Sequence, residues 1–253
     1  MGLTLTILGC DGTYAGPGGA CSGYLVRSPT TSLWIDAGSG TLSALQRHVG
    51  LADLDAVIVT HVHPDHCLEL PVLRNALRFG VGVEGLPVVT TAEVRDVVDE
   101  LTGGAAPTFA WEVVTGGDTV DIGDLRCAFA RTDHPVETLA VRVDHDGRSL
   151  VYTSDTGPGF TLADLVPDGN GIDLVLCEAT MAADREGDAP HLSGRQAGSL
   201  AAAAGARRLV LTHLAPGSDP VARRAEAATT YGGPITVAAA GDTHHVEPQG
   251  QPG

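Results

Sequence analysis

Short apolar runs, separated by turns that contain glycine, proline or aspartate, recur along the whole chain. Residues 3–9 alternate apolar and threonine positions, as a half-buried strand does, whereas residues 56–59 (AVIV) form a continuous apolar run typical of a buried strand. A run of strands is expected within residues 109–154. Further strands are predicted, in whole or in part, at residues 24–27, 33–35, 125–133, 139–143, 150–153, 172–176, 209–212 and 235–239.

Apolar positions at helical spacing alternate with these strands. Thr90, with Glu93 three residues later, fits a helix-capping box, and the stripe Val94, Val97, Val98 and Leu101 is predicted to pack into the core. The pair Asp146-Gly147 predicts a hairpin turn. Other helices are predicted at residues 41–48, 68–79, 193–204 and 221–231.

Length and composition favour one α/β domain over residues 1–253. The chain has 253 residues and 43% apolar composition, which is enough for one large core. We expect a cytoplasmic protein, because no apolar stretch could span a bilayer and the N-terminus lacks the features of a signal peptide. Five cysteines without a C-x-x-C pair predict reduced thiols.

The formal net charge of -16 favours a small-molecule substrate over an extended nucleic acid. Binding to a polyanion is driven by basic groups that displace counterions from phosphates, and this chain has few of them. The charge does not exclude one bound phosphate, because two divalent ions would make the cavity far more positive than the surface. We expect no membrane partner, and the sequence leaves a monomer and a homodimer both open.

Histidines and a carboxylate gather directly after the apolar run 56–59. The segment T-H-V-H-P-D-H places His61, His63, Asp65 and His66 within six positions. Alternating His-X-His at a strand end puts two imidazoles on one side of the chain, and the next turn presents Asp65 and His66 toward a second position. Imidazole and carboxylate ligands suit zinc, with manganese or iron as alternatives.

Three more candidate ligands follow predicted strands further along the chain. His134, Asp155 and His213 each have an ordinary interpretation when taken singly, as a turn cap or a surface histidine. Together with the first cluster they complete ligand sets for two divalent metal ions. The first ion is assigned to His61, His63 and His134, the second to Asp65, His66 and His213, and Asp155 bridges the two.

The H-x-H-x-D-H signature, followed by His, Asp and His in this order, resembles the metallo-β-lactamase-fold hydrolase superfamily along essentially the whole chain. The resemblance implies an α/β fold of the αββα sandwich type, in which two packed mixed β-sheets carry helices on their outer faces and the metals lie at one edge. The segment 176–214, which contains LCEATM, HLSGRQAG and LTHL, is similar to the ribonuclease Z and phosphodiesterase branch. In that branch the residues matching Glu178 and His191 act as a pair near the leaving group. Residues 16–26 and 134–143 resemble an actinobacterial group linked to atypical class II cyclic nucleotide phosphodiesterases.

The expected function is therefore a dinuclear metal-dependent phosphodiesterase for a small phosphodiester such as a cyclic nucleotide. A metal-bound hydroxide oriented by Asp65 attacks phosphorus, and His191, held by Glu178, acts as the general acid. Glyoxalase II-like or lactonase-like hydrolysis of a thioester or lactone is the main alternative, since those enzymes share the cluster without requiring the pair. A ribonuclease Z-like endonuclease is disfavoured by the acidic charge and the short hairpin between His134 and Asp155. A non-catalytic metal-binding or regulatory protein would have little need of the complete ligand set.

One glycine-rich loop keeps two interpretations. Residues 9–23 match neither a dinucleotide fingerprint nor a phosphate-binding loop. They form either a tight, irregular connection or a rim loop whose backbone amides face the site.

Overall fold

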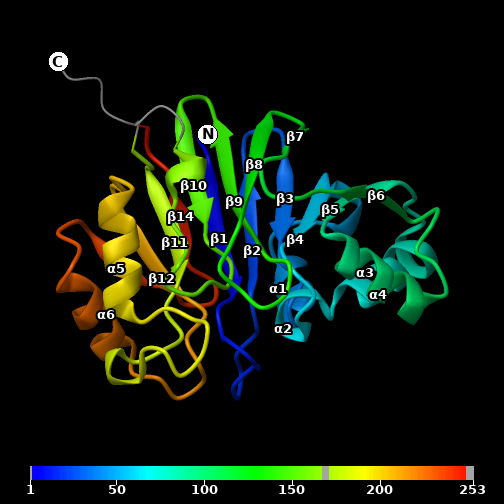
Figure 1. Ribbon diagram of the computed structural model, residues 1–253. Helices are drawn as coiled ribbons and strands as arrows, with labels where there is room; N and C mark the ends of the chain where they lie inside the picture. The colour runs from blue at the N-terminus through cyan, green and yellow to red at the C-terminus, as the bar shows by residue number, and fades with distance from the viewer. Residues whose placement is uncertain (1, 167–170, 249–253) are drawn as a thin grey trace.

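Two seven-stranded β-sheets pack face to face and carry helices on their outer sides (Figure 1). This computed structural model describes residues 2–166 and 171–248. The predicted αββα sandwich is confirmed. The first sheet has the order β14-β1-β2-β3-β4-β5-β6, with β1 (Thr4–Gly9), β2 (Gly23–Arg27), β3 (Ser32–Ile35), β4 (Ala56–Val59), β5 (Leu86–Thr90), β6 (Phe109–Val113) and β14 (Thr243–His245). The second has the order β13-β12-β11-β10-β9-β8-β7, with β7 (Thr119–Ile122), β8 (Leu125–Arg131), β9 (Leu139–His145), β10 (Arg148–Tyr152), β11 (Leu174–Glu178), β12 (Leu209–Thr212) and β13 (Ile235–Val237).

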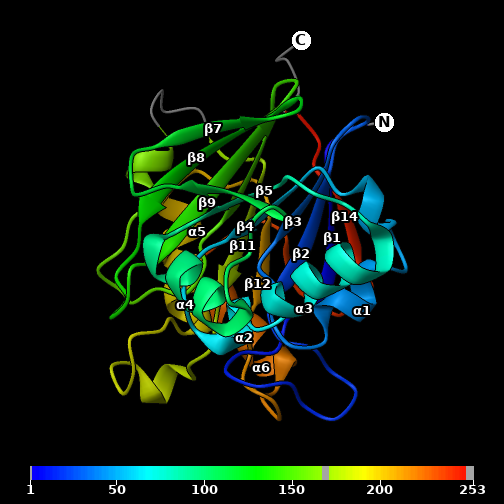
Figure 2. The ribbon, with the colours of Figure 1, turned by 90° about the vertical axis from the view of Figure 1, so that its right-hand side faces the viewer.

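Each sheet is covered by its own set of helices, which lie on opposite sides of the sandwich (Figures 1 and 2). The second sheet carries α5 (Gly194–Ala203) and α6 (Pro220–Ala228). Short 3-10 turns lie at residues 51–53, 163–165 and 183–185. The first sheet carries α1 (Thr41–Leu45), α2 (Pro64–Cys67), α3 (Leu70–Asn75), the π-helical turn η2 (Ala76–Val81) and α4 (Ala92–Thr102). Within residues 2–166 and 171–248, none of the helices combines the length and the apolar character needed to span a membrane.

The continuous apolar runs are explained by strands that are buried on both faces. In β4, Ile58 packs into the core shared by the two sheets, whereas Val57 and Val59 face the helices of the first sheet. In β11, Leu176 joins the shared core and Val175 faces α5 and α6. Such strands are parallel to their neighbours, so helices must cover the face that the other sheet does not.

Several element boundaries differ from the predictions. The helix predicted at residues 68–79 starts earlier, at Pro64, and is divided before Pro71, whose ring lacks the backbone N–H that would continue the hydrogen-bond ladder. Thr90 does not cap a helix: it ends strand β5, and its hydroxyl donates to the carbonyl of Val59. Helix α4 follows Thr91, which makes no side-chain cap.

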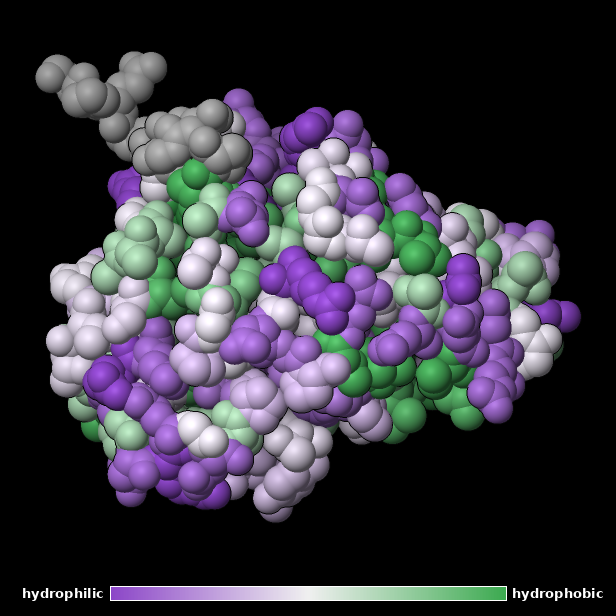
Figure 3. Space-filling model, in the orientation of Figure 1, coloured by the Kyte–Doolittle hydropathy of each residue, from purple (hydrophilic) through white to green (hydrophobic). Residues whose placement is uncertain are grey.

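The apolar stripe of α4 is only half buried. Val94 and Val98 are buried, but Val97 and Leu101 are exposed, so the predicted core stripe was wrong for two of its four members. They belong to a group of exposed apolar side chains on α3, η2 and α4, which is visible as green surface in Figure 3.

The last described strand contains two histidines. His244 and His245 lie in β14, which pairs antiparallel with β1 at the edge of the first sheet. The sequence PQGQPG at residues 248–253 predicts a frayed tail, and this segment lies, apart from Pro248, outside the described residues. Other strands match closely: residues 56–59 and 209–212 are exact, and the predicted hairpin at Asp146-Gly147 joins β9 and β10.

The fold generates one quantitative stability prediction. Leu176 is fully buried between the sheets, so Leu176→Ala should lower the free energy of unfolding by about 2–5 kcal/mol, because the cavity cannot collapse completely. Leu101→Ala is the matched control, since this leucine is 64% exposed, and it should change stability by no more than about 0.5 kcal/mol. Urea denaturation measures both. Equal losses would contradict the placement of Leu176 in the shared core.

Candidate metal centre

The first predicted ligand group converges at the ends of β4, β8 and β10. His61, His63, His134 and Asp155 each offer a ligand atom within 4.8 Å of the others. His63 Nδ1 lies 3.1 Å from His61 Nε2 and 3.3 Å from His134 Nε2, and His61 Nε2 lies 3.7 Å from Asp155 Oδ2. Three ring nitrogens and one carboxylate oxygen at such spacings match the ligand set of one transition-metal ion.

The second predicted group lies beside the first. Asp65, His66 and His213 also offer atoms within 4.8 Å of one another, and all three residues are buried. His213 Nε2 lies 3.2 Å from His66 Nε2 and 3.2 Å from Asp65 Oδ2. The structure thus brings together all seven residues that the sequence predicted as ligands.

Asp155 lies between the two groups. Its Oδ2 faces His61, whereas its Oδ1 lies 3.3 Å from His66 Nε2 and 3.4 Å from His213 Nε2. Asp155 Oδ1 is buried without a hydrogen-bond partner. A carboxylate oxygen in that state is costly unless a cation neutralises it, so the residues present fit a pair of divalent ions with Asp155 between them.

Asp36 supports the site and was not identified from the sequence. It follows β3, is fully buried, and its Oδ2 lies 2.7 Å from His66 Nδ1. The same carboxylate accepts hydrogen bonds from the Tyr152 hydroxyl at 2.9 Å and from the Thr60 amide at 2.8 Å. Burial, and then the charge of Asp36, raise the pKa of Tyr152 well above 10, so its hydroxyl keeps the proton it donates. A histidine that donates one ring N–H to a carboxylate keeps its other nitrogen free for a metal.

Hydroxyl groups orient two further histidines. The Thr60 hydroxyl donates to Asp36 and lies 3.1 Å from His61 Nδ1. The Thr180 hydroxyl donates to Glu178 at 2.8 Å and lies 2.8 Å from His213 Nδ1. A hydroxyl that donates its single proton to a carboxylate accepts from the ring N–H, which leaves Nε2 of each histidine facing the cluster. In the sequence, only their position next to strand ends could have indicated that these threonines support the site.

Glu178 and His191 form the predicted pair. Glu178 is fully buried at the end of β11, and its Oε1 lies 2.7 Å from His191 Nδ1. Burial by itself lowers the pKa of His191, but the hydrogen bond and charge of Glu178 outweigh it and raise the pKa to about 8. His191 also offers a ring nitrogen within 4.8 Å of ligand atoms of Asp155 and His213. The pair therefore lies at the ligand cluster, with His191 protonated near neutral pH.

Unusual backbone geometry is concentrated at this edge of the sandwich. Among the described residues, five non-glycine residues have a left-handed φ, and four of them adjoin the cluster or belong to it. Residues held in this region are strained and persist only where the surroundings fix them, which is common at functional sites. The four are Thr13, Asp36, Ser154 and His213, and the fifth, Asp146, belongs to the hairpin turn.

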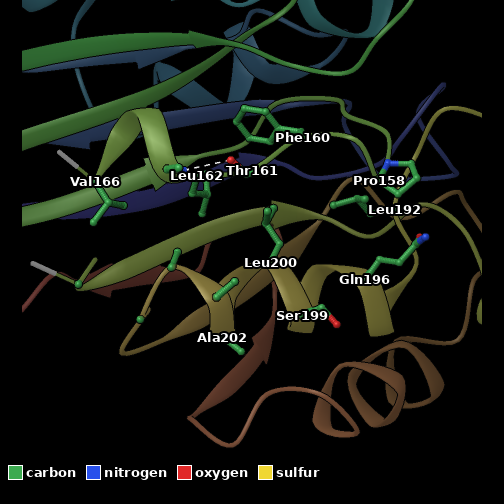
Figure 4. Close-up of a pocket in the computed structure, with 15 residues that line it drawn as sticks. Pro158, Phe160, Thr161, Leu162, Val166, Leu192, Gln196, Ser199, Leu200 and Ala202 are labelled. Atoms are coloured by element: carbon green, nitrogen blue, oxygen red, sulfur yellow. Dashed lines mark hydrogen bonds between the residues drawn. The ribbon is translucent and has the colours of Figure 1, made fainter. Parts of the chain in front are cut away.

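A separate apolar cavity lies between helix α5 and the segment 158–166 (Figure 4). It has a volume of about 800 Å³, and Phe160, Leu162, Leu192 and Leu200 are among the side chains that line it. It contains none of the seven predicted ligands, so its walls lack the groups that hydrolysis requires. The chemistry is assigned to the cluster of histidines and carboxylates.

The family model described as "Beta-lactamase superfamily domain" matches residues 31–214. The uncharacterized protein Rv1339 of Mycobacterium tuberculosis is 34% identical over 99% of this chain and 94% of its own length. The probable metallo-hydrolase YhfI of Bacillus subtilis is 31% identical over 94% of this chain and 98% of its own length. Ribonuclease Z of Mycobacterium bovis is 29% identical over 97% of this chain and 98% of its own length.

Solved structures agree with this relationship. The crystal structure of YhfI from Bacillus subtilis superposes with a TM-score of 0.86 at 30% identity, covering 96% of this chain and 98% of YhfI. A diphosphatase from the PhnP family shares the fold, with a TM-score of 0.76 at 18% identity, covering 97% of this chain and 98% of the diphosphatase. From its sequence and its fold, the chain belongs to the beta-lactamase superfamily, in the branch that includes ribonuclease Z, and is a metal-dependent hydrolase.

Proposed function

We propose that the protein hydrolyses a small phosphodiester, such as a cyclic nucleotide. The observation that carries the proposal is the Glu178–His191 pair, which adds a proton donor to a ligand cluster suited to two metal ions. A phosphodiester needs both parts, because its alkoxide leaving group departs slowly without a proton. Ribonuclease Z is among the relatives, and a diphosphatase is among the structures that share the fold.

The metal ligands follow the two groups that the geometry brings together. His61, His63 and His134 would hold one ion, Asp65, His66 and His213 the other, and Asp155 would bridge them. Zinc fits the imidazole-rich set best, with manganese or iron as alternatives. Bound there, two divalent ions would polarise the phosphoryl oxygens and lower the pKa of water to about 7.

Asp65 and His191 take the two protein-based roles in the reaction. Asp65 orients the attacking water: burial opposes its ionisation, but the hydrogen bond with His213 and the charges of His66 and His213 outweigh burial and hold its pKa well below the usual range. His191 protonates the leaving oxygen and takes its proton back from solvent. Glu178 fixes the ring of His191 through Nδ1, so that Nε2 is the nitrogen that delivers the proton.

Two of the alternatives, a thioester and a large RNA, account for fewer of these features. A thioester releases a thiolate, which leaves without a proton, so a buried Glu178 devoted to a protonated His191 would serve no purpose there. Cleavage of a large RNA fits poorly with a net charge of -16 and with the short hairpin between β9 and β10. A small anionic ester fits both the pair and the overall charge.

The two-ion ligand set generates a test on metal content. The purified protein should bind two divalent ions and lose activity on chelation. Asp155→Ala should weaken the binding of both ions, because the bridging carboxylate that screens their mutual repulsion is gone. Asp121→Ala, which removes an exposed carboxylate on β7, should leave the metal content at two. One ion in active parent protein, with Asp155→Ala unchanged, would reject the dinuclear ligand set.

Asp65→Asn tests the orientation of the nucleophile. The amide is nearly isosteric, but it is uncharged and has a donor NH2 group in place of one acceptor oxygen, so turnover per bound ion should fall by about 100-fold or more. Turnover is compared at equal metal occupancy, measured by elemental analysis on the same samples. If parent and variant have equal turnover per bound ion, Asp65 serves metal binding alone.

His191→Ala tests the general acid with two phosphodiesters. One releases p-nitrophenolate, a good leaving group that needs little protonation, and the other releases a ribose alkoxide. The variant should keep most activity on the first and lose about 10²- to 10⁴-fold on the second. His245→Ala, an exposed histidine on β14, is the control and should match the parent on both.

Two results would contradict the assignment in different ways. An equal loss on both phosphodiesters would make His191 a binding or structural residue. A parent enzyme that acts only on lactones or thioesters would refute the phosphodiesterase function itself.

A further inference from the structure

The glycine-rich loop after β1 reaches the candidate metal centre through one backbone amide. The N–H of Thr13 donates to Asp65 Oδ2 at 2.8 Å. This same oxygen lies 3.2 Å from His213 Nε2 and 3.6 Å from His66 Nε2. The amide therefore contacts the carboxylate oxygen that faces the other two members of the second ligand group, and of the two interpretations of this loop the structure supports the rim loop.

Gly12 allows this loop to lie directly against His213. A Cβ atom at residue 12 would lie 2.6 Å from the His213 carbonyl oxygen and 2.8 Å from its Nδ1, which is too close for any side chain. The Gly12 amide donates to the carbonyl of Leu214 at 3.0 Å, and Asp11 forms a parallel bridge with Leu214. The loop is thus fixed to the segment that follows β12 of the second sheet. Its Thr13 amide contacts Asp65 in α2, which follows β4 of the first sheet.

Thr13 adopts a conformation that its own side chain does not explain. Its φ is 70°, in the left-handed region that β-branched residues rarely enter, and its side chain is exposed. Two bonds fix the turn around it: Tyr14 N donates to Gly12 O at 2.8 Å, and Gly16 N donates to Asp11 Oδ2 at 2.8 Å. The strained backbone directs the Thr13 N–H toward Asp65.

We propose that the Thr13 amide is a positioning group that fixes the carboxylate of Asp65 for the second metal ion. A hydrogen bond on one lone pair of Oδ2 restricts rotation of the carboxylate and leaves the remaining lone pairs for the ion. The proposal rests on the ligand set given under the proposed function, but it concerns metal affinity and needs no particular substrate. Partners of this kind, which orient a ligand without touching the metal, typically change metal affinity or activity by about 10- to 100-fold.

A backbone ester at residue 13 tests the amide alone. Replacing Thr13 by the corresponding α-hydroxy acid exchanges the N–H for an oxygen and keeps the side chain. The dissociation constant of the second zinc ion, measured by competition with a chelator, should rise by about 10- to 100-fold, while that of the first ion stays unchanged. The matched control is the same ester at Tyr14, whose amide donates within the loop to Gly12 O. It should leave both zinc affinities unchanged.

Other results would contradict either the role of the Thr13 amide or the two-ion ligand set. If zinc affinity is unchanged in the Thr13 ester, or is weakened equally by both esters, the Thr13 amide serves only the structure of the loop. Unfolding temperatures of the metal-free proteins are measured alongside, and a midpoint for the Thr13 ester far below that of the Tyr14 ester would give the amide a role in folding instead. A parent protein that binds only one zinc ion would overturn the two-ion ligand set, whereas two ions with no effect of the ester would overturn this inference alone.

Discussion

Burial of the Asp155 carboxylate between two groups of imidazoles is the interaction on which this site depends. Asp155 is 2% exposed, and its Oδ1 has no hydrogen-bond partner. Burying a charge in this way is unfavourable unless an opposite charge compensates it, and the nearby ring nitrogens cannot all be protonated at once. Burial and the neighbouring histidines already hold the pKa of His61 well below 6.5. The buried carboxylate therefore favours a site in which bound cations supply the compensating positive charge.

The sandwich places these groups directly beyond the ends of its strands. β4 of one sheet and β12 of the other both end at the same edge (Figure 1), where His61 is the second residue after β4 and His213 directly follows β12. Because the sheets are packed on a shared apolar core, the distance between the two ends is set by side-chain volume rather than by loops. The strained φ angles of Asp36 and His213 show where the chain turns sharply to aim a side chain inward.

The sequence predicted the ligands because each one follows an apolar run, and such runs are recognisable from local pattern alone. Asp36 follows β3 in the same way, but an aspartate close to glycines is common in turns, and its role depends on Tyr152, 116 residues away. The Thr13 amide has no side-chain signal at all. β5 and β14 were not predicted, since Pro87 interrupts the first and the second is only three residues long. The local pattern did not reveal the groups that support these ligands from distant parts of the chain.

The charge balance of the centre favours an anionic substrate. The seven candidate ligands include two carboxylates, so two divalent ions would leave the cluster with an excess of about two positive charges. His191, protonated beside Glu178, adds no net charge to the pair but offers a proton on the face that meets the substrate. A phosphodiester brings one negative charge and develops more as the bond to the leaving oxygen breaks, whereas a lactone or thioester enters neutral. Preorganised positive charge stabilises most the transition state that carries more negative charge, and this supports the proposed phosphodiester over a neutral ester.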